Sequence, residues 1–342
     1  MADYTDREII LSAKEVDVKF KVRGRVLNAI RGISLDLYKG ESIAIVGESG
    51  SGKSVFTKTF MGLLESNGYI NSGSIMYKGM DLAKFKTNKE WQAIRGKEIA
   101  MVSQDPMTSL NPLKVVGKQI QEAIELHRGL KGAEAKRLAI ELLEDVGIAN
   151  PEKRYNQYPH EFSGGMRQRA MIAMSLICEP KLIIADEPTT ALDVTIQAQI
   201  LDLMKDLKDK LNTSIILITH DLGVVADLCS RINVMYGGIV VETGTTEDIF
   251  YRPKHPYTWG LLRSVPNPKE NTKEKLKPIE GQPPDLLKPP VGCPFAARCD
   301  YAMKICINKQ PPQFEVGENH SAACWLCHED APKVESPIRR IK

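Results

Sequence analysis

Long apolar runs are absent from this sequence of 342 residues. No stretch approaches the roughly 20 consecutive apolar residues that a membrane-spanning helix needs. The opening residues, MADYTDREII, are too acidic and polar for a secretory signal. We therefore expect a protein of the cytoplasm that contacts membranes only through partner proteins.

A charge excess and an internal repeat are missing as well. The 46 basic and 43 acidic residues leave a net charge of +3, and both signs are interleaved along the chain. This balance gives no reason to expect a nucleic-acid partner. At ~100 to 200 residues per domain, the length predicts one large α/β domain with appendages.

The clearest pattern that is present is GESGSGKS, which follows an apolar run at Ser42 to Val46. It has the form G-x-x-x-x-G-K-S of a phosphate-binding loop between a strand and a helix. Glycines let backbone N–H groups turn toward phosphates, Lys53 reaches the terminal phosphates, and the Ser54 hydroxyl completes a magnesium shell. The helix that starts near Gly52 adds the positive end of its dipole. The pattern predicts a nucleoside triphosphate bound by Gly47, Ser49, Gly50, Ser51, Gly52, Lys53 and Ser54.

Polar residues follow two later apolar runs. LIIADE ends in Asp186 and Glu187, and SIILIT ends directly before His220. A carboxylate at such a strand tip is where a phosphate-loop fold holds its magnesium ion, which predicts this role for Asp186. Glu187 lies one residue further and is predicted to activate the attacking water as general base. His220 is predicted to contact a phosphate.

The segment FSGGMRQR precedes a stretch of helical character. A serine and two glycines at a helix start can form a second phosphate site, although the same residues also suit an ordinary turn. One triphosphate needs only one such site on a chain. We interpret Ser163, Gly164, Gly165 and Met166 as binding the nucleotide of a second subunit, so that two chains meet head to tail.

Together and in this order, these motifs resemble those of the ABC-type ATPases. The resemblance adds Gln104, after the run Ile99 to Ser103, and the segment Ala191 to Asp193. It implies a magnesium-dependent ATPase that works as a dimer. In it Ser54, Gln104 and Asp186 hold magnesium, Asp193 links the two sites, and His220 contacts the terminal phosphate.

A narrower resemblance is to the ATPase subunits of oligopeptide and dipeptide importers, and among them to the D-type subunits. It rests on QDPMTSLNP, SGGMRQR, DEPTTALDVTIQAQI and RPKHPYTWGLLRSVP. Met166 stands where most of the superfamily has glutamine, a variant of D-type subunits that pair with a distinct F-type subunit. The resemblance implies two membrane permease subunits, an extracytoplasmic peptide-binding protein, a place at the cytoplasmic face of the membrane, and no direct contact with the peptide.

Other functions remain open from the sequence. An importer of nickel, glutathione or another solute would carry the same motifs, because the selecting residues lie on other polypeptides. A soluble ABC ATPase acting on ribosomes or DNA would ordinarily need two cassettes or a long coiled-coil insertion, and neither is seen. Phe20 is the nearest aromatic candidate for stacking on adenine, and no residue is assigned to that role.

The expected fold is α/β: a phosphate-loop ATPase with a mostly parallel sheet, a helical insert and a loop-rich C-terminal extension. We place the nucleotide-binding core at 1–104 and 179–250, the helical insert at 105–178 and the extension at 251–342. Prolines crowd the region from Pro253 to Pro312, which disfavours regular helix there.

The extension holds five of the seven cysteines, spaced C-x5-C-x6-C-x17-C-x2-C. Because disulfides are rare in the cytosol, clustered cysteines there favour a metal centre over free thiols, the other interpretation. The wide gaps favour a [4Fe–4S] cluster, whereas zinc, the alternative, usually takes closely spaced pairs. The importer resemblance implies the ligands Cys293, Cys299, Cys306 and Cys324, with Cys327 left as a substitute.

Overall fold

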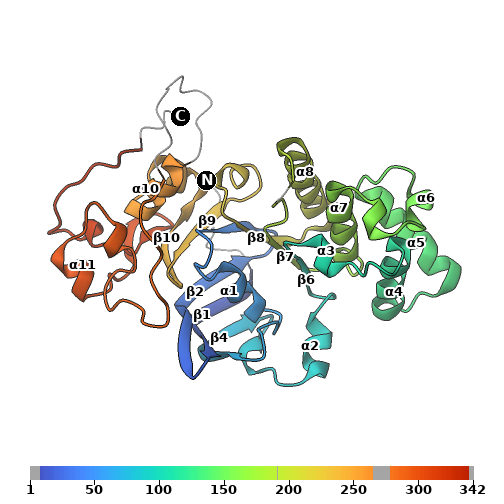
Figure 1. The fold of residues 1–342 in the computed structure, drawn as a ribbon, viewed down its shortest axis with the longest axis horizontal. Coiled ribbons are helices and arrows are strands. Elements are labelled where there is room, and N and C mark those ends of the chain that lie inside the picture. Colours follow the sequence, from blue (N-terminus) through green and yellow to red (C-terminus); the bar gives the residue numbers. More distant parts are fainter. Residues whose placement is uncertain (1–7, 191, 265–277, 339–342) are drawn as a thin grey trace. The chain divides into compact units, whose positions relative to one another are not determined.

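The computed structural model describes residues 8–190, 192–264 and 278–338 (Figure 1). The chain divides into two compact units. One contains residues 1–38, 42–84 and 219–342, and the other contains residues 39–41 and 85–218. In the part of the chain that is described, no helix combines the length and apolarity needed to cross a membrane.

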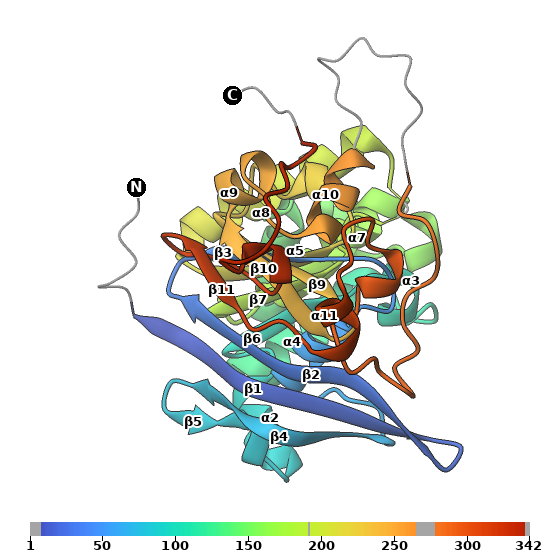
Figure 2. The ribbon, with the colours of Figure 1, turned by 90° about the vertical axis from the view of Figure 1, so that its left-hand side faces the viewer.

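The first unit contains an antiparallel sheet in the order β2-β1-β4-β5. Its strands are β1 (Ile9–Val22), β2 (Arg25–Tyr38), β4 (Gly68–Tyr77) and β5 (Met80–Asp81), and Figure 2 shows them side by side. Alternate residues of β1, including Val16, Val18 and Phe20, are buried while their neighbours are more exposed. This period of two is what a strand with one core face requires.

The same unit carries the strand that leads into the phosphate loop. Strand β3 (Ser42–Val46) is buried at all five positions and pairs in parallel with β9 (Arg231–Tyr236). Beyond β9 come β10 (Ile239–Thr245), β12 (His320–Ala322) and β11 (Phe314–Gly317), all antiparallel. The C-terminal segment thus extends the sheet of the unit that holds the loop.

Short helices complete the first unit. They are α1 (Lys53–Thr59), α9 (Thr246–Tyr251), α10 (Pro256–Arg263) and α11 (Lys304–Asn308). Helix α10 forms in the proline-rich region where regular helix was disfavoured. Pro256 is its first residue, a position where no intrahelical N–H bond is lost, and the preceding His255 accepts a hydrogen bond from Tyr257 N at 3.0 Å.

The second unit contains the parallel strands β6 (Ile99–Val102), β7 (Leu182–Asp186) and β8 (Ser214–Thr219), with β7 between the others. Strands β7 and β8 are buried at every position, as continuous apolar runs in a parallel sheet should be. The expected α/β class with parallel central strands is therefore present.

Helices make up the rest of the second unit. They are α2 (Asn88–Ile94), α3 (Pro106–Ser109), α4 (Val116–Arg128), α5 (Gly132–Asp145), α6 (Pro151–Tyr155), α7 (Gly164–Ser175) and α8 (Val194–Leu211). Helices α3 to α7 lie consecutively between β6 and β7. Gly117 of α4 packs so closely on the Tyr155 ring that a Cβ there would lie 2.1 Å from it.

Candidate functional site

The phosphate-loop sequence forms a tight turn between β3 and α1. Gly47 has φ +156°, and a Cβ on it would lie 2.2 Å from the carbonyl oxygen of Met235. Gly52 has φ +102°, and its Cβ would lie 2.9 Å from the carbonyl oxygen of Ala29. Only glycine fits either position. A Cβ atom would clash with these carbonyl oxygens, and residues with a side chain rarely adopt these positive φ angles.

Lys53 and Ser51 give the loop its polar interior. Lys53 is 5% exposed, and its Nζ donates to the carbonyl oxygens of Gly47 at 2.7 Å and Glu48 at 3.0 Å. The loop therefore curls around its own ammonium group. The Ser51 hydroxyl is buried and has no hydrogen-bond partner among the described residues. An ammonium group, a buried hydroxyl and a cradle that tolerates no Cβ suit an anionic ligand.

The second unit brings Gln104 and Glu187 together. Gln104 Nε2 donates to Glu187 Oε2 at 3.0 Å, and Thr190 Oγ donates to the same oxygen at 2.9 Å. Glu187 has φ +47°, a left-handed conformation that is uncommon for a residue with a side chain. Asp186, the last residue of β7, is 5% exposed. The end of β7 thus holds two carboxylates in different surroundings, Asp186 buried in the strand and Glu187 in the turn that follows.

The SGGM segment lies at the start of α7, as the sequence predicts. Ser163 caps this helix, and its Oγ accepts from Met166 N at 3.3 Å. A Cβ on Gly165 would lie 2.7 Å from Ile196 Cγ2, so this glycine allows α7 to approach α8 closely. Asp193 caps α8 and accepts from Ile196 N at 3.0 Å, whereas Ala191 lies outside the described residues. The two helix starts are therefore neighbours.

His220 directly follows β8 and is exposed. The strand pattern predicted this place at the tip of the strand. The next residue, Asp221, accepts from Gly223 N at 2.7 Å and fixes the turn after the histidine.

The four predicted cysteine ligands line one small cavity, together with His255 and Phe295. Burial raises the pKa of Cys293 and of Cys299 to about 11, so both are protonated thiols near neutral pH without a metal. A metal centre would have to displace these protons. Within the described residues, no three His, Cys, Asp or Glu side chains are arranged to hold a single metal ion.

His255 is an additional polar group of this cavity that the sequence reasoning did not single out. Burial lowers its pKa to about 4, so the ring is neutral near pH 7. Its Nδ1 accepts from Tyr257 N, which places the proton on Nε2. That buried Nε2 has no hydrogen-bond partner among the described residues. His255 therefore gives the cavity an N–H group that could donate a hydrogen bond to a bound sulfide or thiolate.

Cys327 lies beside Cys324 rather than at the cavity itself. The hydrogen bond between the two side chains raises the pKa of Cys324 and lowers that of Cys327. Cys327, the cysteine not assigned as one of the four ligands, is therefore a direct neighbour of the predicted ligand Cys324.

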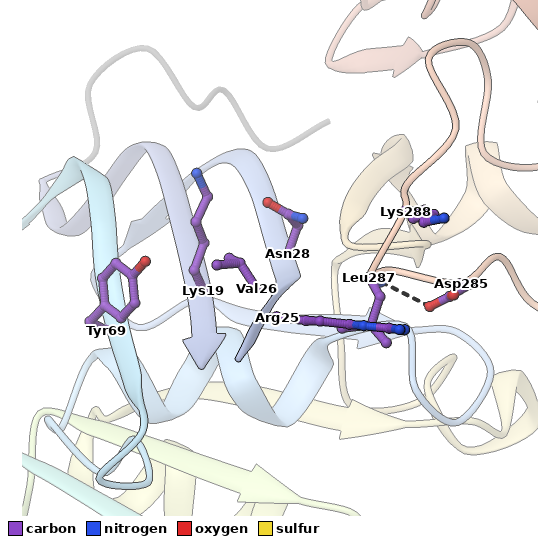
Figure 3. Close-up of a pocket in the computed structure, with 8 residues that line it drawn as sticks. All are labelled: Lys19, Arg25, Val26, Asn28, Tyr69, Asp285, Leu287 and Lys288. Atoms are coloured by element: carbon purple, nitrogen blue, oxygen red, sulfur yellow. Dashed lines mark hydrogen bonds between the residues drawn. The ribbon is translucent and has the colours of Figure 1, made fainter. Parts of the chain in front are cut away.

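An open pocket that the sequence did not predict lies beside the antiparallel sheet (Figure 3). Its walls come from the strand residues and from the segment around Leu287, whose N donates to Asp285 Oδ1 at 2.9 Å. The lining residues are Lys19, Arg25, Val26, Asn28, Tyr69, Asp285, Leu287 and Lys288. Phe20 does not line it. Phe20 is 9% exposed, and its ring packs on Gly68.

Comparison with known proteins finds two protein families that match successive stretches of the chain. The family described as "ABC transporter" matches residues 30–190, and the family described as "Oligopeptide/dipeptide transporter, C-terminal region" matches residues 241–306. The oligopeptide transport ATP-binding protein OppD of Bacillus subtilis is 57% identical over 96% of this chain and 92% of its own. The dipeptide transport ATP-binding protein DppD of Lactococcus lactis is 52% identical over 96% and 93%.

Solved structures give the same result for the fold. The chain is similar to the dimeric structure of MJ0796, a bacterial ABC transporter cassette, with a TM-score of 0.62 and 27% identity. The likeness covers 69% of this chain and 98% of that one.

Proposed function

Because the chain belongs to the ATP-binding subunits of oligopeptide and dipeptide ABC transporters, we propose that it hydrolyses ATP to drive peptide uptake. The observation that carries this proposal is the phosphate loop, in which Gly47 and Gly52 admit no side chain and Lys53 occupies the interior. The whole-length similarity to relatives named for oligopeptide and dipeptide transport supports the peptide substrate.

In the proposed reaction the loop residues 47–54 hold the phosphates, and Ser54, Gln104 and Asp186 hold magnesium. When bound, the ion would neutralise charge on the phosphate oxygens. Glu187 takes a proton from the attacking water, and His220 contacts the terminal phosphate. The bonds from Gln104 and Thr190 support this role for Glu187, since both reach one oxygen and so orient the carboxylate.

We further propose that two ATPase chains share each nucleotide. Residues Ser163, Gly164, Gly165 and Met166 would bind the nucleotide of the partner, and Asp193 would link the sites. The adjacent starts of α7 and α8 support this, as does the dimeric state given for MJ0796. Met166 in the signature favours an F-type ATPase subunit as the partner.

Two permease subunits and an extracytoplasmic peptide-binding protein would complete the importer, with this chain at the cytoplasmic face of the membrane. The permease would contact the segment Gln104 to Leu113 and the helices that follow it. Met107 and Leu113 in this segment are 50% and 85% exposed, which supports an apolar docking surface. The peptide itself would not touch this chain.

Labelled-peptide uptake in cells that lack this chain tests the function. The parent chain should restore uptake, whereas Lys53→Ala should not. Uptake of nickel and of glutathione is measured in the same cells. Restoration of either one without restoration of peptide uptake would overturn the peptide assignment and leave the ATPase assignment intact.

We also propose that Cys293, Cys299, Cys306 and Cys324 hold a [4Fe–4S] cluster. Their common cavity supports this, as does the buried His255 N–H that could donate to a cluster sulfur. When bound, such a cluster would crosslink a segment that has little regular structure of its own. No step of ATP hydrolysis depends on it.

Iron, sulfide and zinc analysis of anaerobically purified protein tests this assignment. We expect about four irons and four sulfides per chain, as the cluster formula requires. Cys299→Ser should lose them, while Cys229→Ser, at a buried cysteine elsewhere, should retain them. Stoichiometric zinc without iron would contradict the cluster and establish a zinc site in its place.

A further inference from the structure

The C-terminal segment reaches the phosphate loop through a partly buried ion pair. Arg298 Nη1 lies 2.6 Å from Glu48 Oε2, and Nη2 lies 3.0 Å from Glu48 Oε1. The Arg298 side chain is 4% exposed and that of Glu48 is 28% exposed. Glu48 is the second residue of the loop, and Arg298 lies 250 residues further along the chain. The pair therefore has the two-pronged geometry in which arginine binds a carboxylate most strongly.

The remaining donors of Arg298 are also satisfied, which fixes the guanidinium in place. It donates to the hydroxyl of Tyr236 at 3.1 Å and to the carbonyl oxygens of Ile279 at 3.0 Å and Glu280 at 2.8 Å. The bond to Glu48 raises the pKa of Arg298 further, so the group stays charged. A guanidinium held on all sides cannot follow a carboxylate that moves, so Glu48 is fixed relative to the C-terminal segment.

The loop backbone is held at the same residue. Glu48 N donates to the hydroxyl of Tyr257 at 2.8 Å, and Glu48 O accepts from Lys53 Nζ at 3.0 Å. Tyr257 in turn packs against Phe295 and Tyr236, with ring centroids 5.3 and 4.5 Å away. The backbone and the side chain of Glu48 are therefore both bound by residues that follow β10 along the chain, Tyr257 and Arg298.

A carboxylate in this loop opposes the ligand that the loop is built to take. ATP carries several negative charges on its phosphates, and a nearby charge that is partly shielded from water repels them over several ångströms. Arg298 lies on the Glu48 carboxylate and cancels that charge. Removing one member of such a pair leaves the other uncompensated.

We propose that Arg298 is a positioning residue for nucleotide binding. It neutralises Glu48, so that the phosphate loop can accept a triphosphate, and the C-terminal segment thereby completes the nucleotide site of its own chain. This inference rests on the proposed function, since it concerns the same loop and the same ligand.

Calorimetric titration of ATP and ADP into four proteins tests the inference. Arg298→Gln should weaken ATP binding about tenfold and ADP binding less, because ADP carries less charge. Adding Glu48→Gln to this variant should restore ATP binding to within about threefold of the parent. Arg252→Gln is the control, because Arg252 makes two bonds to Asp248, at 3.0 and 2.7 Å, away from the loop. The control should bind both nucleotides as the parent does.

The opposite pattern would overturn the inference. If Arg298 only supports the fold, Arg298→Gln will weaken ATP and ADP equally and the second substitution will restore nothing. If Arg298→Gln does not fold, Arg298→Lys answers the question, since it keeps the charge without the two-pronged bond. This variant should bind ATP within about threefold of the parent, and a tenfold loss would contradict charge neutralisation. A parent chain that binds no ATP would overturn the proposed function instead.

Discussion

At the scale of single residues, both the backbone and the side chain of Glu187 are held by hydrogen bonds. Its left-handed backbone, at φ +47°, costs energy that a residue with a side chain rarely bears outside functional sites. Its backbone N donates to Ile218 O at 2.9 Å, and Gln104 and Thr190 orient its side chain. The sequence predicted a carboxylate here, but only the fold specifies its direction.

Glu187→Gln should lower ATP turnover by a factor of about 100 or more while ATP binding remains. The amide keeps the shape of the side chain but cannot take a proton from water, and general bases contribute about 10² to 10⁴ in rate. Phosphate release and calorimetric ATP binding measure the two effects. Hydrolysis at the parental rate would remove Glu187 from its proposed role.

Lys53→Ala should show the reverse behaviour and weaken ATP binding itself. The Lys53 ammonium group lies inside the loop, and residues 47–54 contain no other lysine. In the variant, no other side chain of the loop supplies a positive charge to attract the terminal phosphates. Lys58→Ala, in the last turn of the same helix, is the matched control and should bind ATP normally. Equal binding by all three proteins would refute the role of Lys53.

At the scale of elements, the start of α7 depends on a close approach to α8. The two glycines of the SGGM segment differ in this respect. A Cβ on Gly165 would lie 2.7 Å from Ile196 Cγ2, whereas one on Gly164 would lie 3.3 Å from Leu192 Cδ2. The first contact cannot be tolerated without movement, and the second needs only a small adjustment.

Gly165→Ala should therefore reduce the free energy of unfolding by about 1 to 3 kcal/mol, the usual cost of overpacking. Gly164→Ala should change it by less than about 1 kcal/mol, because only a slight shift of a leucine methyl group is needed. Urea unfolding of both variants measures the difference. If Gly164→Ala proves the more damaging to stability, the packing of α7 on α8 differs from that described.

At the scale of the whole molecule, the chain contains one phosphate loop and one SGGM segment. The proposed reaction needs the loop of one chain and the segment of another. A chain that has bound ATP but cannot hydrolyse it should therefore accumulate as a dimer.

With magnesium and ATP present, the Glu187→Gln variant should elute from a sizing column at the mass of a dimer. If the partner is the F-type subunit, the dimer should appear once that subunit is added. Lys53→Ala should stay monomeric under the same conditions, since it lacks bound nucleotide to close the dimer. Light scattering on the column gives the mass directly. Full ATPase activity from a chain that remains monomeric would contradict the shared site.

The sequence predicted the parts whose chemistry depends on local order. A strand, a glycine-rich turn and a helix start in succession are enough to form a phosphate loop, and residues 42–59 form those elements. The serine cap of α7 and the two carboxylates at the end of β7 also follow from short segments. The cysteine pattern predicted one group of thiols, and four of the five line a single cavity.

Contacts between distant residues could not be predicted in this way. Arg298 was one basic residue among 46, and Glu48 occupied a loop position that tolerates many residue types. Helix α10 also formed among prolines because Pro256 falls at its first position, where proline is favoured.

The sequence by itself therefore determined the class of the fold, the local form of the phosphate loop and the family to which the chain belongs. Tertiary structure decided which side chains surround the loop. The ion pair of Glu48 with Arg298 and the hydrogen bond to Tyr257 join residues more than 200 positions apart. No local pattern encodes such pairs, because they arise only when the C-terminal segment packs on the sheet that carries the loop.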